Sequence, residues 1–438
     1  MKILLVGNGG REHAMCRALA TARPTPTLLI APGNPGTATL GRNIAMSVGD
    51  IDAICRFAQQ EAVDLLIPGP EAPLVAGLTD AAVAAGIPCC GPSKAAAALE
   101  GSKAFTRELT SAVGVPTPRF VIVDSPGDLA DALASWSHVP VLKADGLAGG
   151  KGVFLPESLE DCLTVGRRLL DGALGDAGRT VVIEDREEGV EASVFFACHG
   201  RDAVLLPHAR DHKRLGDGDV GPNTGGMGAI SPNPQLDPLL LQRVRTQIVD
   251  PTLQALAARG TPFVGFLYVG LMLTSRGPVL IEFNVRLGDP EAQAILPRLG
   301  DGDFAALCLA TARGTLASLR LREDPRHTCA VVLAAAGYPD KPQRGDVVTA
   351  DGLFDGGLFH DDVWLIHAGT APQARPNGTA LVTAAGRVLT VVGRGTSAQQ
   401  ARDQAYKGVA RVRFDGMQHR RDIGAALGSH KFSTGCIP

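Results

Sequence analysis

Aromatic residues are scarce in this sequence. Only 4% of its 438 residues are Phe, Tyr or Trp. Proteins that bind single-stranded nucleic acid stack the bases on aromatic side chains beside a basic groove. Here 42 Lys and Arg residues are balanced by 45 Asp and Glu residues, for a net charge of −3. The composition therefore argues against a nucleic-acid partner, and any bound phosphate must be held by a local group of residues.

Long apolar runs are also missing. The longest, residues 329–336, has eight residues, well short of the ~18 that a membrane span needs. At the N-terminus only residues 3–6 are apolar before Gly7, which is too short for a signal peptide. We therefore expect a soluble, cytoplasmic protein without a membrane partner.

The nine cysteines are scattered, and no two of them form a C-x-x-C pair. Most have apolar neighbours, as Cys198 does after Phe196 and Ala197. This pattern favours small core residues in a reducing compartment over metal or redox sites.

The chain is long enough for about two to four domains. Short apolar runs alternate with helical patterns from residue 2 to residue 90, including strands at 27–30 and 63–68 and helices at 51–60 and 77–85. This alternation predicts a parallel α/β domain over residues 1–101.

The rest of the chain does not continue this regular alternation of strands and helices. Residues 102–324 mix strands and helices with two glycine-rich stretches, and residues 325–425 predict a small α+β domain. The latter should contain a strand at 328–335, a hairpin joining 379–383 to 388–392, and a helix capped by Thr396 or Ser397. Residues 426–438 form a polar tail.

A first glycine loop, Gly7-Asn8-Gly9-Gly10-Arg11, follows the first strand and opens a helix, so its N–H groups can bind an anion. A dinucleotide-binding domain is disfavoured because Glu12 replaces the third glycine and no carboxylate ends the second strand. We interpret the loop as a phosphate or small-substrate site, to which Arg11 adds charge. A tight turn without a ligand is the alternative.

A second loop, residues 145–153, contains four glycines and Lys151, and follows a strand that carries Lys143. Glycines let backbone N–H groups approach a polyphosphate, and the lysines offset its charge. It is not a Walker loop because Gly152, rather than Ser or Thr, follows Lys151. The alternative is a glycine-rich hairpin with incidental lysines.

Residues 278–286 predict a strand with Leu280, Glu282 and Asn284 on one face and Val279, Ile281 and Phe283 on the other. Two oxygen ligands on a rigid element suit Mg²⁺, whose other ligands are nucleotide phosphates and water. Glu184, at the end of an apolar run, and Glu191 could accept hydrogen bonds from adenine and ribose. A solvated face and surface carboxylates are the respective alternatives.

In this order, the motifs resemble the glycinamide ribonucleotide synthetases of the ATP-grasp superfamily. The resemblance spans about residues 1–425 and includes 68–74, 99–103 and 211–214. Most weight falls on Gly221-Pro222-Asn223-Thr224-Gly225-Gly226-Met227-Gly228, followed by Ile281-Glu282-Phe283-Asn284 and residues 286–291. It implies an N-terminal parallel α/β domain (1–101), a central ATP-grasp domain (102–324) with a mobile lid at about 119–190, and a small C-terminal α+β domain (325–425).

The resemblance also implies a reaction. ATP, glycine and 5-phosphoribosylamine would give glycinamide ribonucleotide, ADP and phosphate through glycyl phosphate, in purine biosynthesis, in a monomer or weak homodimer. It implies ATP contacts at Lys103, Lys143, Gly149, Gly150, Lys151, Glu184 and Glu191, and Mg²⁺ or Mn²⁺ at Glu282 and Asn284. It implies catalytic roles for Arg286, Asp211 and Lys213, and substrate contacts at Gly9, Gly10, Arg11, Glu71, Asn223, Thr224, Gly226 and Asp289.

Some questions stay open. Residues 268–272 lack the further metal carboxylate found in many ATP-grasp enzymes, so the number of metal ions is undetermined. His212 is a candidate acid–base group that the chemistry does not require. Two other functions compete: an ATP-grasp ligase or carboxylase for another carboxylate, and a nucleotide sensor without chemistry, which would be expected to lack Lys143, Glu282 or Asn284.

Overall fold

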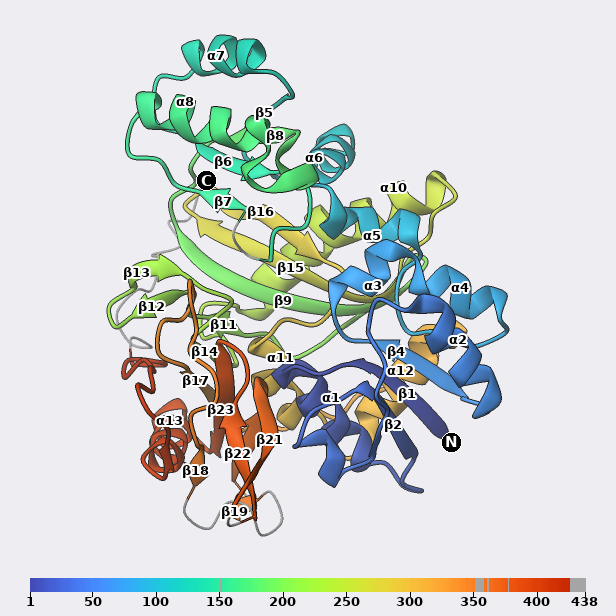
Figure 1. Ribbon diagram of the computed structural model, residues 1–438. Coiled ribbons are helices and arrows are strands. Elements are labelled where there is room, and N and C mark those ends of the chain that lie inside the picture. The colour runs from blue at the N-terminus through green and yellow to red at the C-terminus, as the bar shows by residue number, and fades with distance from the viewer. Residues whose placement is uncertain (150–151, 351–357, 361, 377, 426–438) are drawn as a thin grey trace.

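The computed structural model describes residues 1–149, 152–350, 358–360, 362–376 and 378–425 (Figure 1). Its sheets are parallel in the N-terminal region and antiparallel elsewhere, which confirms the predicted mixture of α/β and α+β parts. In the described ranges, no helix has the length and apolar character needed to cross a membrane. Two predicted ATP contacts, Gly150 and Lys151, lie outside these ranges.

The N-terminal region, blue in Figure 1, is a parallel sheet with strand order β3-β2-β1-β4. Both of its faces are buried: α1 and α12 cover one, and α2 and α4 cover the other. The predicted alternation is confirmed, and it ends near residue 90 in a single bridge between Leu66 and Cys89. The elements are β1 (Lys2–Gly7), α1 (Gly10–Ala20), β2 (Thr27–Pro32), η1 (Thr37–Thr39), β3 (Arg42–Asn43), α2 (Ile51–Gln60), β4 (Leu65–Pro68), α3 (Glu71–Ala76), α4 (Leu78–Ala84) and α5 (Lys94–Gly101).

A small antiparallel sheet, at the top of Figure 1, lies within the region expected to form a lid. Its strand order is β5-β8-β6-β7, and Leu142 and Ile183 pack with Leu129 in its core. Because residues alternate along a strand, Lys143 and Glu184 lie on the opposite face. The elements, with the preceding helix, are α6 (Lys103–Ala112), β5 (Phe120–Val123), α7 (Pro126–Ala134), β6 (Val141–Ala144), β7 (Val153–Phe154), α8 (Leu159–Arg168), η2 (Leu169–Ala173), η3 (Gly175–Gly178) and β8 (Val181–Glu184).

Long antiparallel strands form the centre of the molecule, in the order β10-β9-β15-β16. One face packs on α9 and α10, and the other faces α11 and α12 at one end, so that Phe195 and Phe266 share a core with the N-terminal sheet. The elements are β9 (Val190–His199), β10 (Asp202–Leu205), α9 (Pro238–Val244), η4 (Arg245–Val249), α10 (Asp250–Ala258), β15 (Val264–Thr274), β16 (Gly277–Asn284), α11 (Glu291–Ile295), η5 (Leu296–Arg298), α12 (Asp303–Arg313) and η6 (Leu316–Ser318).

A bulge in β16 corrects the predicted strand faces. Gly270 pairs with Glu282, but the next residue, Leu271, pairs with Leu280, so Ile281 is an extra residue. Leu280 therefore shares a face with Phe283 in the core and not with Glu282 and Asn284, as the period of two had predicted. Glu282 and Asn284 do share a face, as expected, because the bulge lies before both of them.

The C-terminal region, orange to red in Figure 1, is a sheet with the order β11-β14-β17-β23-β20-β19. Its first two strands come from the central part of the chain. The strand predicted at 328–335 and the helix capped by Ser397 are confirmed. The elements are β11 (Arg210–Asp211), β12 (Arg214–Gly216), β13 (Val220–Asn223), β14 (Gly228–Ser231), β17 (His327–Ala334), β18 (Thr349–Ala350), β19 (Leu358–His360), β20 (Val363–His367), β21 (Thr370–Arg375), β22 (Gly378–Thr383), β23 (Arg387–Gly395), α13 (Ala398–Val409) and β24 (Val412–Arg413).

The hairpin predicted from 379–383 to 388–392 is wrong. Strand β22 pairs with β21, whereas β23 pairs with β17 and β20 in another sheet. Between them, the N–H groups of Ala384 and Ala385 donate to the carbonyl of Gly369, which redirects the chain. The sequence pattern correctly predicted strands β22 and β23, but it did not show which strands they pair with.

Candidate active site

One face of the long central sheet gathers polar residues from three adjacent strands. The register places Glu191 and Ser193 of β9, Tyr268 of β15, and Glu282 and Asn284 of β16 on this face. Ser193 and Tyr268 are buried, and their hydroxyl oxygens are 3.1 Å apart. Three of these residues, Glu191, Glu282 and Asn284, were predicted from the sequence.

Lysines surround Glu282. Burial would raise the pKa of its carboxyl group, but Lys213, Lys143 and Lys103 together hold that pKa below its ordinary value. Lys213 also lies 3.3 Å from the carboxylate of Glu191. Within the described part of the chain, no hydrogen bond or ion pair engages the Glu282 carboxylate, so it is available for another ligand.

Glu184 is buried between two cations. Arg107 of α6 donates to both of its carboxylate oxygens at 2.7 and 2.9 Å, and the Lys143 ammonium lies 2.7 Å away. Burial would raise the pKa of Glu184, but Lys143 and Arg107 lower it to about 2. Burial lowers the pKa of Lys143, and Glu184 offsets part of this effect. Glu184 therefore fixes the position of Lys143, while its predicted contact with adenine stays a prediction.

The start of α6 is bound to the second glycine loop. Asp145 accepts hydrogen bonds from the Ser102 hydroxyl and the Ala104 N–H, at 2.9 and 2.7 Å, and so caps the helix. The Lys103 N–H donates to the Asp145 carbonyl at 3.2 Å. Lys103 is thereby held beside the loop. Gly149 is exposed, and no side chain would obstruct a Cβ there.

Arg286 joins the end of β16 to the N-terminal region. Its guanidinium lies 3.1 Å from Glu71 of α3 and 2.9 Å from the buried Glu100 of α5, and it donates to Asn284 Oδ1 at 3.2 Å. Burial would raise the pKa of Glu71, but Arg286 and Arg11 lower it. The network therefore ties a predicted catalytic residue to predicted metal and substrate residues.

The first glycine loop lies where the N-terminal strand order reverses, between β1 and β4. The buried Glu12 carboxylate accepts a hydrogen bond from the Gly9 N–H at 2.6 Å. It packs so closely on Gly69 that a Cβ there would be 2.1 Å from Glu12 Oε1. Dinucleotide-binding folds bind a pyrophosphate at this position, and a carboxylate repels one, so the exclusion of that function is supported.

Arg11 is held by Glu12 at 2.6 Å and donates to the Leu287 carbonyl at 3.2 Å. Arg286 donates to the same carbonyl at 3.3 Å. A Cβ on Gly10 would be 3.7 Å from Asp289 Oδ1. The structure thus brings Gly10, Arg11, Arg286 and Asp289 together, although 275 or more residues separate the first pair from the second.

The segment around Gly226 is packed against Asp211. Gly226 has a φ of +107°, and a Cβ there would be 2.9 Å from Asp211 Oδ1, so glycine is required. Asp211 Oδ1 is buried and has no hydrogen-bond partner among the described residues. Burial and the nearby Glu291 raise the pKa of Asp211 well above its ordinary value. Thr224 donates to the Lys213 carbonyl at 2.8 Å, which fixes the same segment.

Two predicted substrate residues differ from each other in exposure and contacts. Asn223 is exposed on the ribbon β12–β13, where it pairs with Arg214. Asp289 is fully engaged by protein: Gln293 donates to one oxygen at 2.7 Å and Arg387 lies 3.1 Å from the other. Their substrate contacts stay predictions.

His212 is buried, and its Nδ1 atom has no hydrogen-bond partner within the described ranges. Burial and the nearby Arg210 and Arg420 lower its pKa to about 4. The imidazole is therefore neutral at pH 7. This favours a packing role over that of a proton donor.

Sequence reasoning missed Arg107, Glu100 and Arg387. Arg387 of β23 donates to the carbonyls of Gly225 and Asp289, at 2.5 and 2.6 Å, and so brings the C-terminal region to the site. No local pattern could have identified it, because its partners are 98 and 162 residues away. Glu100 could have been identified from the sequence, because it lies in residues 99–103, one of the segments that carry the family resemblance.

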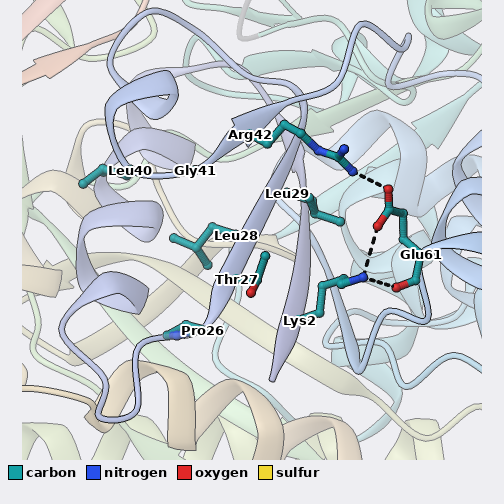
Figure 2. Close-up of a pocket in the computed structure, with 9 residues that line it drawn as sticks. All are labelled: Lys2, Pro26, Thr27, Leu28, Leu29, Leu40, Gly41, Arg42 and Glu61. Atoms are coloured by element: carbon teal, nitrogen blue, oxygen red, sulfur yellow. Dashed lines mark hydrogen bonds and ion pairs between the residues drawn. The ribbon is translucent and has the colours of Figure 1, made fainter.

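A separate hollow of about 390 Å³ lies at the edge of the N-terminal sheet. Figure 2 shows its charged residues: Glu61 lies between Lys2 and Arg42 and pairs with both. None of its nine lining residues belongs to the predicted site.

Comparisons with known proteins find similarity over nearly the whole chain. Three family models match: the N domain of phosphoribosylglycinamide synthetase over residues 1–100, its ATP-grasp (A) domain over 101–292, and its C domain over 328–426. A curated phosphoribosylamine–glycine ligase from Xanthomonas axonopodis pv. citri is 44% identical over 429 residues, which are 97% of each chain.

Solved structures show the same similarity. The crystal structure of phosphoribosylamine–glycine ligase from Thermotoga maritima aligns with a TM-score of 0.83 at 34% identity, covering 97% of this chain and 100% of that one. The biotin carboxylase domain of Hydrogenobacter thermophilus 2-oxoglutarate carboxylase has a TM-score of 0.69 at 15% identity, covering 95% of this chain and 91% of that one. The second similarity concerns the fold alone.

The buried position of Glu184 predicts a pH-dependent stability. Its pKa is about 2 in the folded protein against an ordinary value of 4.5, so its contribution is complete above pH 4.5 and is lost as the pH falls towards 2. The whole effect is on the order of 3 kcal/mol. In denaturant titrations across this window, Glu184→Gln should therefore show a shallower pH dependence of the free energy of unfolding than the wild type.

The exposed Glu188 offers a matched control, because Glu188→Gln removes a carboxylate from the same segment without breaking the buried group. Its pH dependence should follow the wild type. Identical slopes for Glu184→Gln and the wild type would contradict the buried arrangement.

Proposed function

Because this chain belongs to the phosphoribosylglycinamide synthetase family, we propose that it joins glycine to 5-phosphoribosylamine at the expense of ATP. The products are glycinamide ribonucleotide, ADP and phosphate, as in an early step of purine biosynthesis. The observation that carries the proposal is the match to all three family domains, together with the sheet face that gathers Glu191, Glu282 and Asn284.

The residues present fit a divalent cation. Glu282 and Asn284 project oxygen donors from one strand face, and Glu282 is unengaged by described protein groups. No group of three or more His, Cys, Asp or Glu residues in the described ranges is arranged to hold a metal. Glu282 and Asn284 would therefore hold Mg²⁺ or Mn²⁺ together with phosphate oxygens. The ion would neutralise charge on the transferred phosphoryl group.

The lysines form the nucleotide side of the site. Lys143, fixed by Glu184, and Lys103, fixed at the start of α6, present charge to the phosphates, and the loop that begins at Asp145 covers them. Glu191, paired with Lys213, is half-exposed and accessible to ribose hydroxyls. Covering the phosphates excludes water, which would otherwise hydrolyse a reactive acyl phosphate.

The chemistry requires activation of a carboxylate, which is a poor electrophile. A glycine carboxylate oxygen attacks the γ-phosphorus of ATP, the bond to the bridging oxygen breaks, and ADP leaves. The amine nitrogen of phosphoribosylamine then attacks the glycyl carbonyl carbon, phosphate leaves, and the nitrogen releases a proton. Lys213 and Arg286 offset the negative charge that develops in these steps.

The substrate side has complementary charges. Asp211 Oδ1, buried and without a partner among the described residues, suits the glycine ammonium group beside Gly226. Glu71, Arg11 and Arg286 meet where the N-terminal sheet approaches β16, and Gly9 and Gly10 open α1 at the same place. This arrangement supports binding of the phosphosugar there, with the guanidinium groups of Arg11 and Arg286 attracting its phosphate.

Removing the charged metal ligand tests this assignment. Glu282→Ala should lower turnover by about 10²-fold or more, because it removes a charged ligand while the surrounding core is unaffected. The measurement is ADP release at limiting Mg²⁺, with circular dichroism to verify folding. The exposed Glu188→Ala is the control, and near-normal turnover of folded Glu282→Ala would exclude the assignment.

Substrate replacement tests the proposed reaction itself. ADP release should require glycine with freshly prepared phosphoribosylamine, and ATP alone should hardly be hydrolysed. Alanine is the demanding comparison, because one methyl group changes discrimination by only ~10- to 200-fold in a hydrophobic pocket. Faster turnover with bicarbonate or another carboxylate than with glycine would favour a carboxylase or a different ligase.

A further inference from the structure

We infer that Arg107 is a positioning residue, which fixes the bulge in β16 and thereby directs Glu282 towards the nucleotide. This inference rests on the proposed function, because it concerns the same metal and nucleotide site. Arg107 lies in no motif used above. It is 2% exposed, and the four described hydrogen bonds of its guanidinium all reach beyond its own helix.

The bulge allows Leu280 and Glu282, the two neighbours of Ile281, to lie on opposite faces of the sheet. Leu280 packs in the core under the sheet, whereas Glu282 lies on the opposite, active-site face. In a regular strand, residues two apart share a face, so either Leu280 would leave the core or Glu282 would enter it. The extra residue Ile281 removes this conflict.

A bulge leaves backbone groups without partners in the ladder, and here they are satisfied from outside the sheet. Leu280 N–H donates to the Pro116 carbonyl at 2.8 Å. Arg107 donates to the carbonyls of Leu280 and Ile281 at 3.2 and 2.6 Å, and Lys143 donates to the latter at 3.2 Å. Because buried backbone carbonyls without partners are costly, these contacts stabilise the bulged conformation.

The same guanidinium holds the other half of the site. Its Nε and Nη2 atoms donate to the two oxygens of Glu184, which in turn holds Lys143. Figure 1 shows α6 beside β8 and β16, where the small and long sheets meet, and α6 contacts both strands. Arg107 is one helical turn after Lys103, so the two residues lie on the same side of α6.

Arg107 thus sets the separation between phosphate-binding Lys143 and metal-binding Glu282. Its loss should leave the bulge carbonyls unpaired and Glu282 misdirected. The loss should therefore weaken magnesium-dependent nucleotide binding more than binding of the nucleotide alone. Supporting groups around metal ligands typically change metal affinity by about 10- to 100-fold.

The test is calorimetric titration of the full chain with ADP, with and without Mg²⁺, which does not depend on ligase activity. The gain in ADP affinity on adding Mg²⁺ should fall at least ~10-fold in Arg107→Met. Arg107→Lys, which keeps the charge and some donors, should recover part of that gain. Arg167→Met, an exposed substitution on α8, should match the wild type.

Folding and positioning are separated by Glu184→Gln, which breaks the same buried group but leaves Arg107 able to donate to the carbonyls of Leu280 and Ile281. We expect Glu184→Gln to lose thermal stability while it keeps the magnesium-dependent gain, because the bulge carbonyls retain their donor. A wild-type gain in Arg107→Met, or an equal loss of the gain in Glu184→Gln, would overturn the inference. No binding of ADP to the wild type would instead overturn the proposed nucleotide site, and the inference with it.

Discussion

The burial of Glu184 between Arg107 and Lys143 is the interaction on which the rest of the site depends. A buried carboxylate is costly unless its oxygens are paired, and here both are engaged by cations from two different elements. Since Arg107 and Lys143 also donate to the carbonyl of Ile281, the small sheet and the long sheet are joined at one point. Lys143 and Glu282, which we propose to face the phosphates and the metal ion, are therefore positioned by one network.

Around this point, the charges divide according to the proposed chemistry. Lys103, Lys143 and Lys213 surround Glu282 on the nucleotide side. On the substrate side, Arg286 is paired with Glu71 and Glu100, while Asp211 retains a buried oxygen without a partner in the described part of the chain. A zwitterion as small as glycine offers only an ammonium and a carboxylate group for recognition. A site with one free acidic oxygen beside cationic groups suits such a substrate better than an apolar pocket would.

The parts of this arrangement that depend on residues close together in the sequence could be predicted. The alternation of strands and helices predicted the N-terminal sheet, and the Glu-x-Asn spacing predicted that Glu282 and Asn284 share a face. Long-range pairing was not predictable. The bulge at Ile281 depends on Arg107, 174 residues away, so the period of two placed Leu280 on the wrong face. Likewise, β22 and β23 were wrongly predicted to form a hairpin, because the sequence of neither strand indicates which sheet it joins.

The most direct measurement follows an oxygen atom from glycine to phosphate. If the carboxylate attacks the γ-phosphorus, glycine labelled with ¹⁸O in its carboxylate must transfer one labelled oxygen to each phosphate formed. Mass spectrometry of the phosphate from a reaction with ATP and phosphoribosylamine should show this label in a one-to-one ratio with glycinamide ribonucleotide. Phosphate that carries oxygen from solvent water instead, while the amide product accumulates, would contradict activation of glycine by phosphoryl transfer.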